Sequence, residues 1–213
     1  MKKNTLNLHY EILNKNQKKT LESLKDFSKY GVLGGGTALA LQLCHRKSFD
    51  LDIFTSKPIS KKFLYKVKNY YKHIEIITDT GDELSFICPF NVKISFIFYP
   101  FQNFYKPIKT PYLNISSWKD IALDKAHTIG RRGEWRDYVD LYFAIKKGLS
   151  FKNIIKAAKK KFGDAFSEKL FLSQLCYYGD IKDFSAEFLK EKPTKTEIQN
   201  FFEKEVKQLK IIK

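Results

Sequence analysis

The chain has 213 residues, of which 43% are hydrophobic and 15% aromatic, and its formal net charge at pH 7 is +16. This apolar content can bury a core, which excludes a chain dominated by disorder, and no apolar run approaches the length of a membrane span. The N-terminus lacks the apolar stretch and cleavage site of a signal peptide, and the three cysteines form no CxxC pair, so we expect a cytoplasmic protein with reduced thiols and no membrane contact.

The first half of the chain has the periodicities of an α/β unit. Apolar residues spaced as on one helix face predict a helix over 8–29, and 31–33 reads as a short buried strand. After a glycine turn, Thr37 is expected to cap a helix that ends near Cys44. The elements expected next are a strand at 49–54, a helix from Ser60 to about 72, and strands at 74–79, 84–88 and 92–99.

The second half is predicted to be helical. Ser117 and Asp120 resemble a capping box for a helix to about residue 128, and a glycine-containing break separates it from a helix at 135–147. Further helices are expected at 150–161, 164–177, 183–190 and after Pro193. The pattern predicts an α+β protein, in which a mixed sheet flanked by helices occupies 1–105, with the N-terminal helix, and a helical domain occupies 106–213.

Two aspartates one residue apart, Asp50 and Asp52, lie on the second predicted strand. Side chains at i and i+2 share one face of a strand, so the two carboxylates project side by side, while Phe49, Leu51 and Ile53 point to the core. Two carboxylates on one face repel each other unless a cation lies between them, and hard oxygen ligands suit Mg²⁺. The pair is a candidate metal site, although exposed strands also carry such pairs by chance.

Three glycines, Gly34, Gly35 and Gly36, stand between a predicted strand and a predicted helix just upstream of this pair. Backbone N–H groups at such a turn can approach phosphate oxygens closely, and the N-terminus of the helix favours negative charge. A tight strand–helix turn by itself needs only one or two glycines. The sequence therefore offers a phosphate cradle, with Gly35, Gly36 and Thr37 as candidate ligands, ahead of a metal-binding strand.

The stretch GGTALALQLCHRKSFDLDIF, residues 35–54, resembles motif I of the DNA polymerase β-type nucleotidyltransferases. Together with DIALDKAHTIGRRGEWRDYVDLYF at 120–143, it is similar to the AbiEii/AbiGii toxin family, which includes the MenT-like toxins. The resemblance covers roughly residues 28–148. It implies a polymerase β-like nucleotidyltransferase core followed by a helical part that completes the active site.

The resemblance also implies roles for residues of the second motif. Lys125 would neutralise triphosphate charge, and Asp137 would complete the active site as an acceptor or a base, with Asp140 as the second choice. The catalytic set is then Asp50, Asp52, Lys125 and Asp137, and further candidate nucleotide ligands are Arg46, Ser48, Arg132 and Asp140.

Two features of this assignment stay open. Arg136 and Asp140 are spaced i and i+4, so this cluster can instead be an Arg–Asp ion-pair ladder that ties the helical part to the sheet. Many polymerase β-type enzymes carry a third carboxylate on a later strand, but here Ser95 stands at that position, and Glu83 is expected in the wrong register or in a turn. Either Asp137 replaces the missing acid, or deprotonation relies on metal and substrate.

Two smaller features are interpreted as structural. His9, His73 and His127 lack metal-ligand spacing to a cysteine or another histidine, so we expect no zinc. The lysine-rich run KAAKKK at 156–161 is expected to be a solvated helix face, with an RNA-backbone contact as the alternative.

Together these observations predict a nucleotidyltransferase that uses Mg²⁺, or Mn²⁺ in its place, to transfer an NMP from an NTP to an acceptor hydroxyl. The net charge of +16 favours a polyanionic acceptor, with tRNA expected, although a lysine-rich genome would produce the same charge. The resemblance implies the toxin of a type IV, AbiE-like toxin–antitoxin system, with an antitoxin as partner. Two alternatives are transfer to a small molecule or protein, and a non-catalytic relative that binds RNA or a partner.

Overall fold

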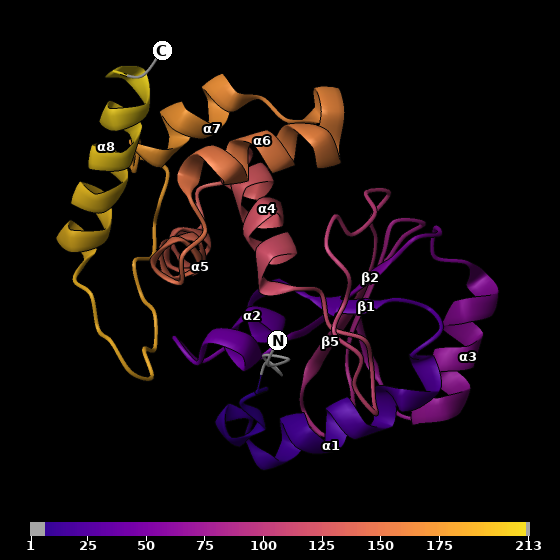
Figure 1. The fold of residues 1–213 in the computed structure, drawn as a ribbon. Coiled ribbons are helices and arrows are strands. Elements are labelled where there is room, and N and C mark those ends of the chain that lie inside the picture. Colours follow the sequence, from indigo (N-terminus) through magenta and orange to yellow (C-terminus); the bar gives the residue numbers. More distant parts are fainter. Residues whose placement is uncertain (1–6, 212–213) are drawn as a thin grey trace, which may run out of the picture. The chain divides into compact units, whose positions relative to one another are not determined.

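The computed structural model of the protein describes residues 7–211, and within them the chain divides into two compact units (Figure 1). The first unit holds the residues up to Cys44 and Ser48–Ser117, and it contains all five strands. The second unit holds His45–Lys47 and the chain from Trp118 onward, and its regular elements are helical.

The predicted division into a sheet-bearing domain over 1–105 and a helical domain over 106–213 stays a prediction. The compact units differ from it in two places, because residues 106–117 belong to the sheet-bearing unit and His45–Lys47 belong to the helical one. The short segment between the glycine turn and the aspartate pair is therefore part of the second unit, although its neighbours on both sides in the chain are part of the first.

The first unit is built on a five-stranded mixed sheet of order β1-β2-β5-β4-β3. β2 and β5 are parallel, and the other neighbouring strands are antiparallel. This is the mixed sheet that the sequence predicted, with strand ends shifted by one or two residues. The strands are β1 (Val32–Gly34), β2 (Leu51–Thr55), β3 (Glu75–Asp79), β4 (Glu83–Ile87) and β5 (Lys93–Phe98).

The helix predicted over 8–29 is wrong in its length, because the segment folds as three shorter pieces. Helix α1 begins only after Asn14, whose side chain accepts a hydrogen bond from the Gln17 N–H while the Gln17 side chain accepts one from the Asn14 N–H. This capping box stops the helix from extending toward the N-terminus. The pieces are η1 (Tyr10–Ile12), α1 (Lys15–Ser23) and η2 (Leu24–Phe27), and the other helices of the unit are α2 (Gly35–Leu43) and α3 (Lys61–Tyr71).

One face of the sheet forms the core of the first unit. Ile53 is in register with Phe96 of β5, which is in register with Leu84 of β4, and all three side chains are buried. The aromatic ring of Phe27, from η2, lies 5.8 Å from the ring of Phe96 and 6.1 Å from that of Phe63 in α3, measured between ring centroids. The pattern that placed Leu51 and Ile53 in the core is confirmed.

The same pattern is wrong for Phe49, whose side chain is 51% exposed. β2 begins at Leu51, so Phe49 lies outside the alternation of the strand. The Gln17 side chain donates to the carbonyl oxygens of Ser48 and Phe49, at 2.8 and 3.2 Å, and these bonds hold the backbone in a different path ahead of the strand.

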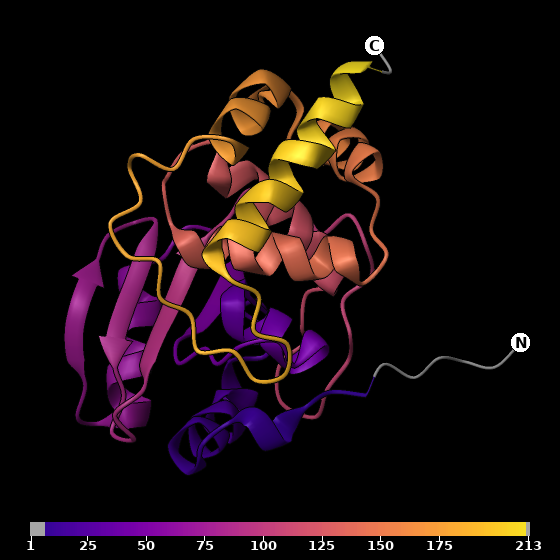
Figure 2. The ribbon, with the colours of Figure 1, turned by 90° about the vertical axis from the view of Figure 1, so that its left-hand side faces the viewer.

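Most helices of the second unit follow the sequence prediction closely, but the helix predicted at 164–177 is shorter and begins only at Glu168, after its Ser167 cap. Ser150 caps α6, and Thr194 and Glu197 make the predicted reciprocal capping bonds at the start of α8. α8 lies against α5 and α7 (Figure 2), and no helix among the described residues is long and apolar enough to cross a membrane. The helices are α4 (Trp118–Ile129), α5 (Trp135–Lys146), α6 (Phe151–Phe162), η3 (Gly163–Ala165), α7 (Glu168–Leu175) and α8 (Lys195–Ile211).

The helix predicted at 183–190 is wrong. This segment has no regular secondary structure, and its residues 187–189 pair with His45–Lys47: the Leu189 N–H donates to the His45 carbonyl at 3.0 Å, and the Lys47 N–H donates to the Glu187 carbonyl at 2.7 Å. Because these backbone groups bond to another segment, they are not used in a helical ladder.

The aromatic core of the first unit makes a direct stability prediction. Replacing Phe27, which is fully buried, with alanine should lower the free energy of unfolding by about 3–5 kcal/mol, because the cavity left among its neighbouring rings cannot close. The matched control is Phe49→Ala, which removes an exposed ring and should cost no more than about 0.5 kcal/mol. Urea unfolding followed by circular dichroism measures both, and equal losses would contradict the prediction.

Candidate active site

The glycine turn and the second aspartate meet within the first unit. Gly34 pairs with Asp52 across β1 and β2, and helix α2 begins at Gly35 with Gly34 as its N-cap. Gly35 has φ +64°, and a Cβ at this position would overlap the Asp52 carboxylate. Only glycine satisfies both requirements, so the turn brings the backbone at the start of α2 directly against the Asp52 side chain.

The prediction that both aspartates lie on the strand is wrong for Asp50, which is exposed and stands just before β2, whereas Asp52 is half-buried on the strand. Thr37 was predicted to cap α2, and this is wrong, because Thr37 lies inside the helix. Its buried hydroxyl donates to the Asp50 carbonyl oxygen at 2.5 Å. The hydroxyl therefore ties the first turn of α2 to the backbone of the aspartate pair, and its predicted role as a phosphate ligand stays a prediction.

The face of the sheet opposite the core carries polar residues beside Asp52. Asp52 is in register with Ser95 of β5, which is in register with Ser85 of β4, so the three side chains share one face. The Ser85 and Ser95 hydroxyl oxygens are 2.9 Å apart, and the Ser85 hydroxyl also contacts the Glu83 carboxylate. Because Ser85 has one hydroxyl proton and a carboxylate only accepts, Ser85 donates to Glu83 and Ser95 donates to Ser85.

The expectation that Glu83 lies in a turn or in the wrong register is therefore wrong. Glu83 is the first residue of β4 and stands two residues before Ser85, on the same face. Ser95 stands at the position of the missing third acid, and the Ser85 hydroxyl links it to the Glu83 carboxylate. The i, i+2 spacing of Glu83 and Ser85 was the sequence signal for this chain, but it depends on a strand boundary that lies one residue earlier than predicted.

The second unit contains a buried ion network centred on Asp140 of α5. The Arg46 guanidinium binds both carboxylate oxygens, through Nε at 2.7 Å and Nη2 at 2.9 Å, and Lys125 Nζ lies 3.0 Å from Oδ2. His45 Nε2 contacts Oδ1 at 2.8 Å. Asp137 adds a second carboxylate, bonded to Lys125 and to Arg132, whose Nη2 lies 3.0 Å from Oδ2. The network consists of the side chains of His45, Arg46, Lys125, Arg132, Asp137 and Asp140.

Pairing overrides burial in setting the charges of this network. Burial opposes ionisation of Asp140, but Arg46 and Lys125 more than offset it and hold the pKa of that carboxyl well below its ordinary value. Burial would likewise lower the pKa of Lys125, and the nearby Asp137 and Asp140 raise it above the ordinary value. The network therefore holds an ionised acid and ionised bases in the interior of the second unit.

His45 is the neutral member of the network. Burial lowers the pKa of its imidazole, and the bond to Asp140 offsets this only in part. A neutral imidazole that faces a carboxylate through Nε2 carries its proton there, which leaves Nδ1 as a bare acceptor. Nδ1 is buried and has no hydrogen-bond partner among the described residues.

The predicted Arg–Asp ladder along one helix is wrong. Arg136 is exposed, and its guanidinium lies 3.5 Å from the Glu134 carboxylate, whereas the cations that bind Asp140 come from positions 46 and 125. The lysine-rich run at 156–161 is also not entirely solvated: Lys161 is buried and pairs with Asp120 at 2.9 Å and with Asp124 at 2.6 Å.

Two groups of side chains have the chemistry to hold a metal ion. Asp52 offers a hard oxygen ligand beside the space that Gly35 leaves open, and Asp50 is two residues before it in the chain. Within the described part of the chain, neither belongs to a group of three or more His, Cys, Asp or Glu residues that could hold an ion. The second group is His9, Glu11 and Cys44, whose ligand atoms lie within 4.8 Å of one another. Sequence spacing did not reveal this group, because Cys44 is distant in the chain.

Comparison with known proteins adds the following. The family model described as nucleotidyl transferase AbiEii toxin, Type IV TA system, matches residues 20–209. An uncharacterized protein of Aquifex aeolicus (strain VF5) is 30% identical in an alignment of 206 residues that covers 92% of this chain and 98% of that protein.

Two solved structures share the fold. MenT4, a nucleotidyltransferase toxin from Mycobacterium tuberculosis H37Rv, has a TM-score of 0.60 at 16% identity, covering 92% of this chain and 82% of its own. JHP933 from Helicobacter pylori has a TM-score of 0.56 at 22% identity, covering 95% of each chain. At these identities the likeness concerns the fold, which agrees with the α+β architecture predicted from the sequence.

The ion network predicts a large loss of stability from one substitution. Asp140→Asn should lower the free energy of unfolding by about 3–5 kcal/mol, because the buried Arg46 and Lys125 lose their shared carboxylate. Glu134→Gln, which breaks an exposed pair at the N-cap of the same helix, is the control and should change it by less than about 1 kcal/mol. Urea titration at pH 7 measures both, and a loss below about 1 kcal/mol for Asp140→Asn would show that the network contributes little.

Proposed function

This chain belongs to the family of nucleotidyl transferase AbiEii toxins, and we propose that it transfers an NMP from an NTP to a hydroxyl group of RNA, with tRNA as the acceptor. Family membership makes it a nucleotidyltransferase with an NTP substrate, as the sequence motifs predicted. The net charge of +16 supports a polyanionic acceptor. The family description supports a toxin role with a cognate antitoxin as its partner.

One observation carries the proposed chemistry: the helix-initiating glycine turn abuts a carboxylate. Gly35 leaves no side chain between the α2 N-terminus and Asp52, so a triphosphate lying on the turn would have its oxygens beside the carboxylate. Asp50 and Asp52 would hold a divalent cation, Mg²⁺ by the nature of their oxygen ligands, and this ion would supply charge neutralisation at the phosphates.

The chain's own groups act mainly by positioning. The backbone N–H groups of Gly35 and Gly36 are among the first of helix α2 and bind phosphate oxygens, with the helix dipole adding favourable charge. The Thr37 hydroxyl fixes the backbone of Asp50 relative to that helix, so the phosphate cradle and the first carboxylate keep a constant separation. Transfer then depends on preorganised geometry more than on covalent participation of the protein.

The catalytic and nucleotide-binding roles predicted for the residues of the second motif have less physical support than those of the glycine turn and Asp52. In the second unit, Lys125 is engaged by Asp137 and Asp140, so binding of a triphosphate by its ammonium group would have to displace a carboxylate. Arg46 stands four residues before Asp50 in the chain, and its charge is paired with that of Asp140. This pairing supports a positioning role for Arg46. The catalytic roles of Lys125 and Asp137, and nucleotide binding by Arg46, Ser48, Arg132 and Asp140, stay predictions.

Glu83 is proposed as the final acceptor of the proton that the attacking hydroxyl loses. Ser95 shares a sheet face with Asp52, and its hydroxyl would take up this proton. At the same time the Ser95 proton would pass to the Ser85 hydroxyl, and the Ser85 proton would pass to the Glu83 carboxylate. Each hydroxyl gains one proton and loses one, so only the carboxylate changes its charge. The two serines and Glu83 would thus replace the acid that is absent at position 95.

The transfer reaction is tested with each α-³²P-labelled NTP, total tRNA and a divalent cation. The wild-type protein should label RNA, and Asp52→Asn should lower the rate at least about 100-fold, because the phosphates lose their cation site. Asp79→Asn, which changes an exposed acid on β3, is the control and should retain full activity. Label on protein or on a small molecule instead of RNA would overturn the proposed acceptor.

The proton path makes a separate prediction. Glu83→Gln should lower kcat about 100-fold while leaving nucleotide affinity, measured by calorimetry, unchanged. Glu75→Gln on the exposed strand β3 is the matched control. An unchanged kcat in Glu83→Gln would rule Glu83 out as the base.

A further inference from the structure

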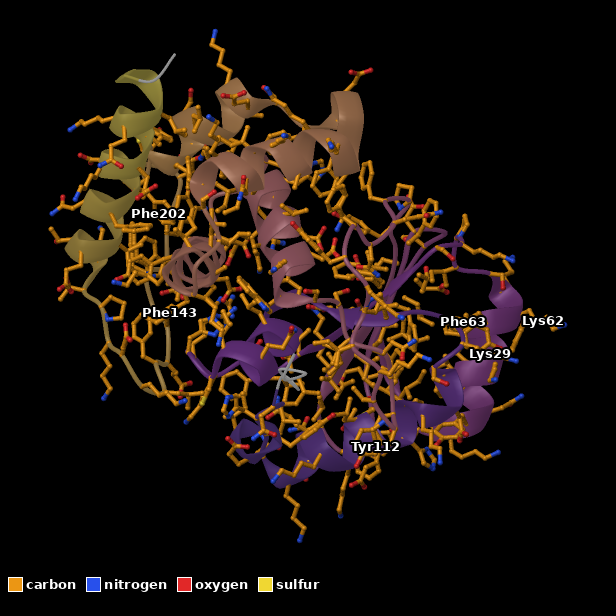
Figure 3. The ribbon with its side chains drawn as sticks, in the orientation of Figure 1. Lys29, Lys62, Phe63, Tyr112, Phe143 and Phe202 are labelled. Atoms are coloured by element: carbon orange, nitrogen blue, oxygen red, sulfur yellow. The ribbon has the colours of Figure 1, made fainter. Side chains whose placement is uncertain are left out.

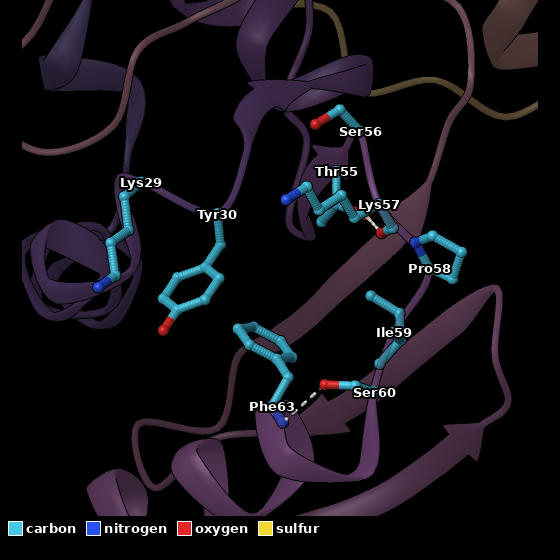
Figure 4. A pocket seen from close by; sticks show the side chains of 9 residues that line it. All are labelled: Lys29, Tyr30, Thr55, Ser56, Lys57, Pro58, Ile59, Ser60 and Phe63. Atoms are coloured by element: carbon cyan, nitrogen blue, oxygen red, sulfur yellow. Dashed lines mark hydrogen bonds between the residues drawn. The ribbon is translucent and has the colours of Figure 1, made fainter.

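A hollow of about 310 Å³ opens on the first unit beyond the end of β2 (Figure 4). The rings of Tyr30 and Phe63 and the side chain of Ile59 line it, and Lys29 and Lys57 extend along its edges. This volume is at the lower end of the range for ligand pockets and suits one nucleotide unit. We refer to it below as the Tyr30 hollow.

A second hollow adjoins the first and shares Tyr30, Ser60 and Phe63 with it. It adds Lys62 and Lys66 from α3, the helix that also carries Phe63 (Figure 3). No aspartate or glutamate is among the described residues that line either hollow. The surface therefore combines four lysines with aromatic walls and has no acidic counterpart in its lining.

Tyr30 reports the positive potential of this surface. Lys66 Nζ donates a hydrogen bond to the Tyr30 hydroxyl at 3.2 Å, and Lys29 Nζ lies 5.3 Å from the ring centroid. The bond from Lys66 lowers the pKa of the Tyr30 hydroxyl, and the charges of Lys29 and Lys62 lower it further. The acid of the neighbouring turn, Asp26, is directed to Tyr70 instead. The lysines thus act on the hollow without an acid to cancel them.

The chemistry of the lining selects the class of ligand. Lysines recognise phosphate groups as point charges, and flat aromatic walls accept the face of a base. An A-form duplex keeps its bases stacked, so only a single strand or a loop can place a base in such a hollow. A lipid headgroup or an acidic peptide would use the lysines but would leave the ring-lined volume without a matching group.

We infer that the Tyr30 hollow is an RNA-binding site that takes one unstacked base, with the flanking phosphates on Lys29, Lys57 and Lys62. The site rests on the proposed function in one respect, since we identify its RNA with the acceptor. Thr55, in the lining, is three residues from Asp52 along β2, a distance of about 10 Å, and its side chain is on the opposite face of the strand. An RNA strand held in the hollow would therefore reach Asp52 by passing around the end of β2.

Binding is measured by fluorescence anisotropy of a labelled single-stranded RNA of twelve nucleotides with the full chain. The triple variant Lys29→Gln, Lys57→Gln, Lys62→Gln should bind at least about 10-fold more weakly, and the slope of log affinity against log salt should fall by about 2, because roughly three phosphate contacts are lost. The matched control is Lys152→Gln, Lys190→Gln, Lys192→Gln, which removes the same charge from exposed lysines of the second unit and should change affinity no more than about 2-fold.

Competitors test the identity of the ligand. An unlabelled duplex RNA should compete poorly with the single strand, and equal competition would overturn the unstacked-base site. Equal weakening by the two triple variants would also overturn it, since net charge alone would then explain binding. If binding to vesicles that contain phosphatidylserine depends on the three lysines and RNA binding does not, the surface would be reassigned to a membrane.

The labelling assay separates this inference from the proposed function. Asp52→Asn should retain wild-type RNA affinity, because the hollow is intact in that variant. If the chain labels no RNA but still binds it through the three lysines, the RNA-binding site stands and the proposed acceptor fails. If the triple variant binds and labels tRNA as the wild type does, the site fails and the proposed function stands.

Discussion

The arrangement of the second unit depends on one buried, ionised carboxylate. Asp140 is fully buried, and a charge in that position is stable only when its partners are placed accurately. Arg46 meets it with two parallel hydrogen bonds, and Lys125 and His45 occupy the remaining directions. The His45–Lys47 segment is held in turn by backbone bonds to the extended stretch around Phe188, so this one acid organises two segments far apart in the chain.

In the first unit, the register of the sheet decides which residues share the candidate site. Alternation along the strands places Ile53 and Phe96 in the core and leaves Asp52 and Ser95 on the other face. The close approach of Gly35 then adds the start of a helix to that face. A nucleotidyltransferase needs phosphate ligands, cation ligands and a proton acceptor near one another, and a single sheet face can supply the elements of all three.

The excess of positive charge has different meanings at different lysines. Lys125 and Lys161 are buried and neutralise acids inside the second unit, so they are part of its interior electrostatics. Lys29, Lys57 and Lys62 are exposed around two adjoining hollows with aromatic rings in their walls, and no acid is among the described residues that line them. Net charge alone therefore does not locate a polyanion site, since burial and pairing decide which cations are available to one.

Local signals in the sequence determined the strands, most helices and the two family motifs, because periodicity and caps such as Ser60 act over a few residues. Other features were decided only by the tertiary structure. Two partners of Asp140, His45 and Arg46, stand 95 and 94 positions away in the chain, and residues 187–189 are not helical because their backbone pairs with His45–Lys47. Glu83 reaches the site face through a pairing of three strands. Such contacts depend on which distant segments meet, and a local pattern carries no information on that.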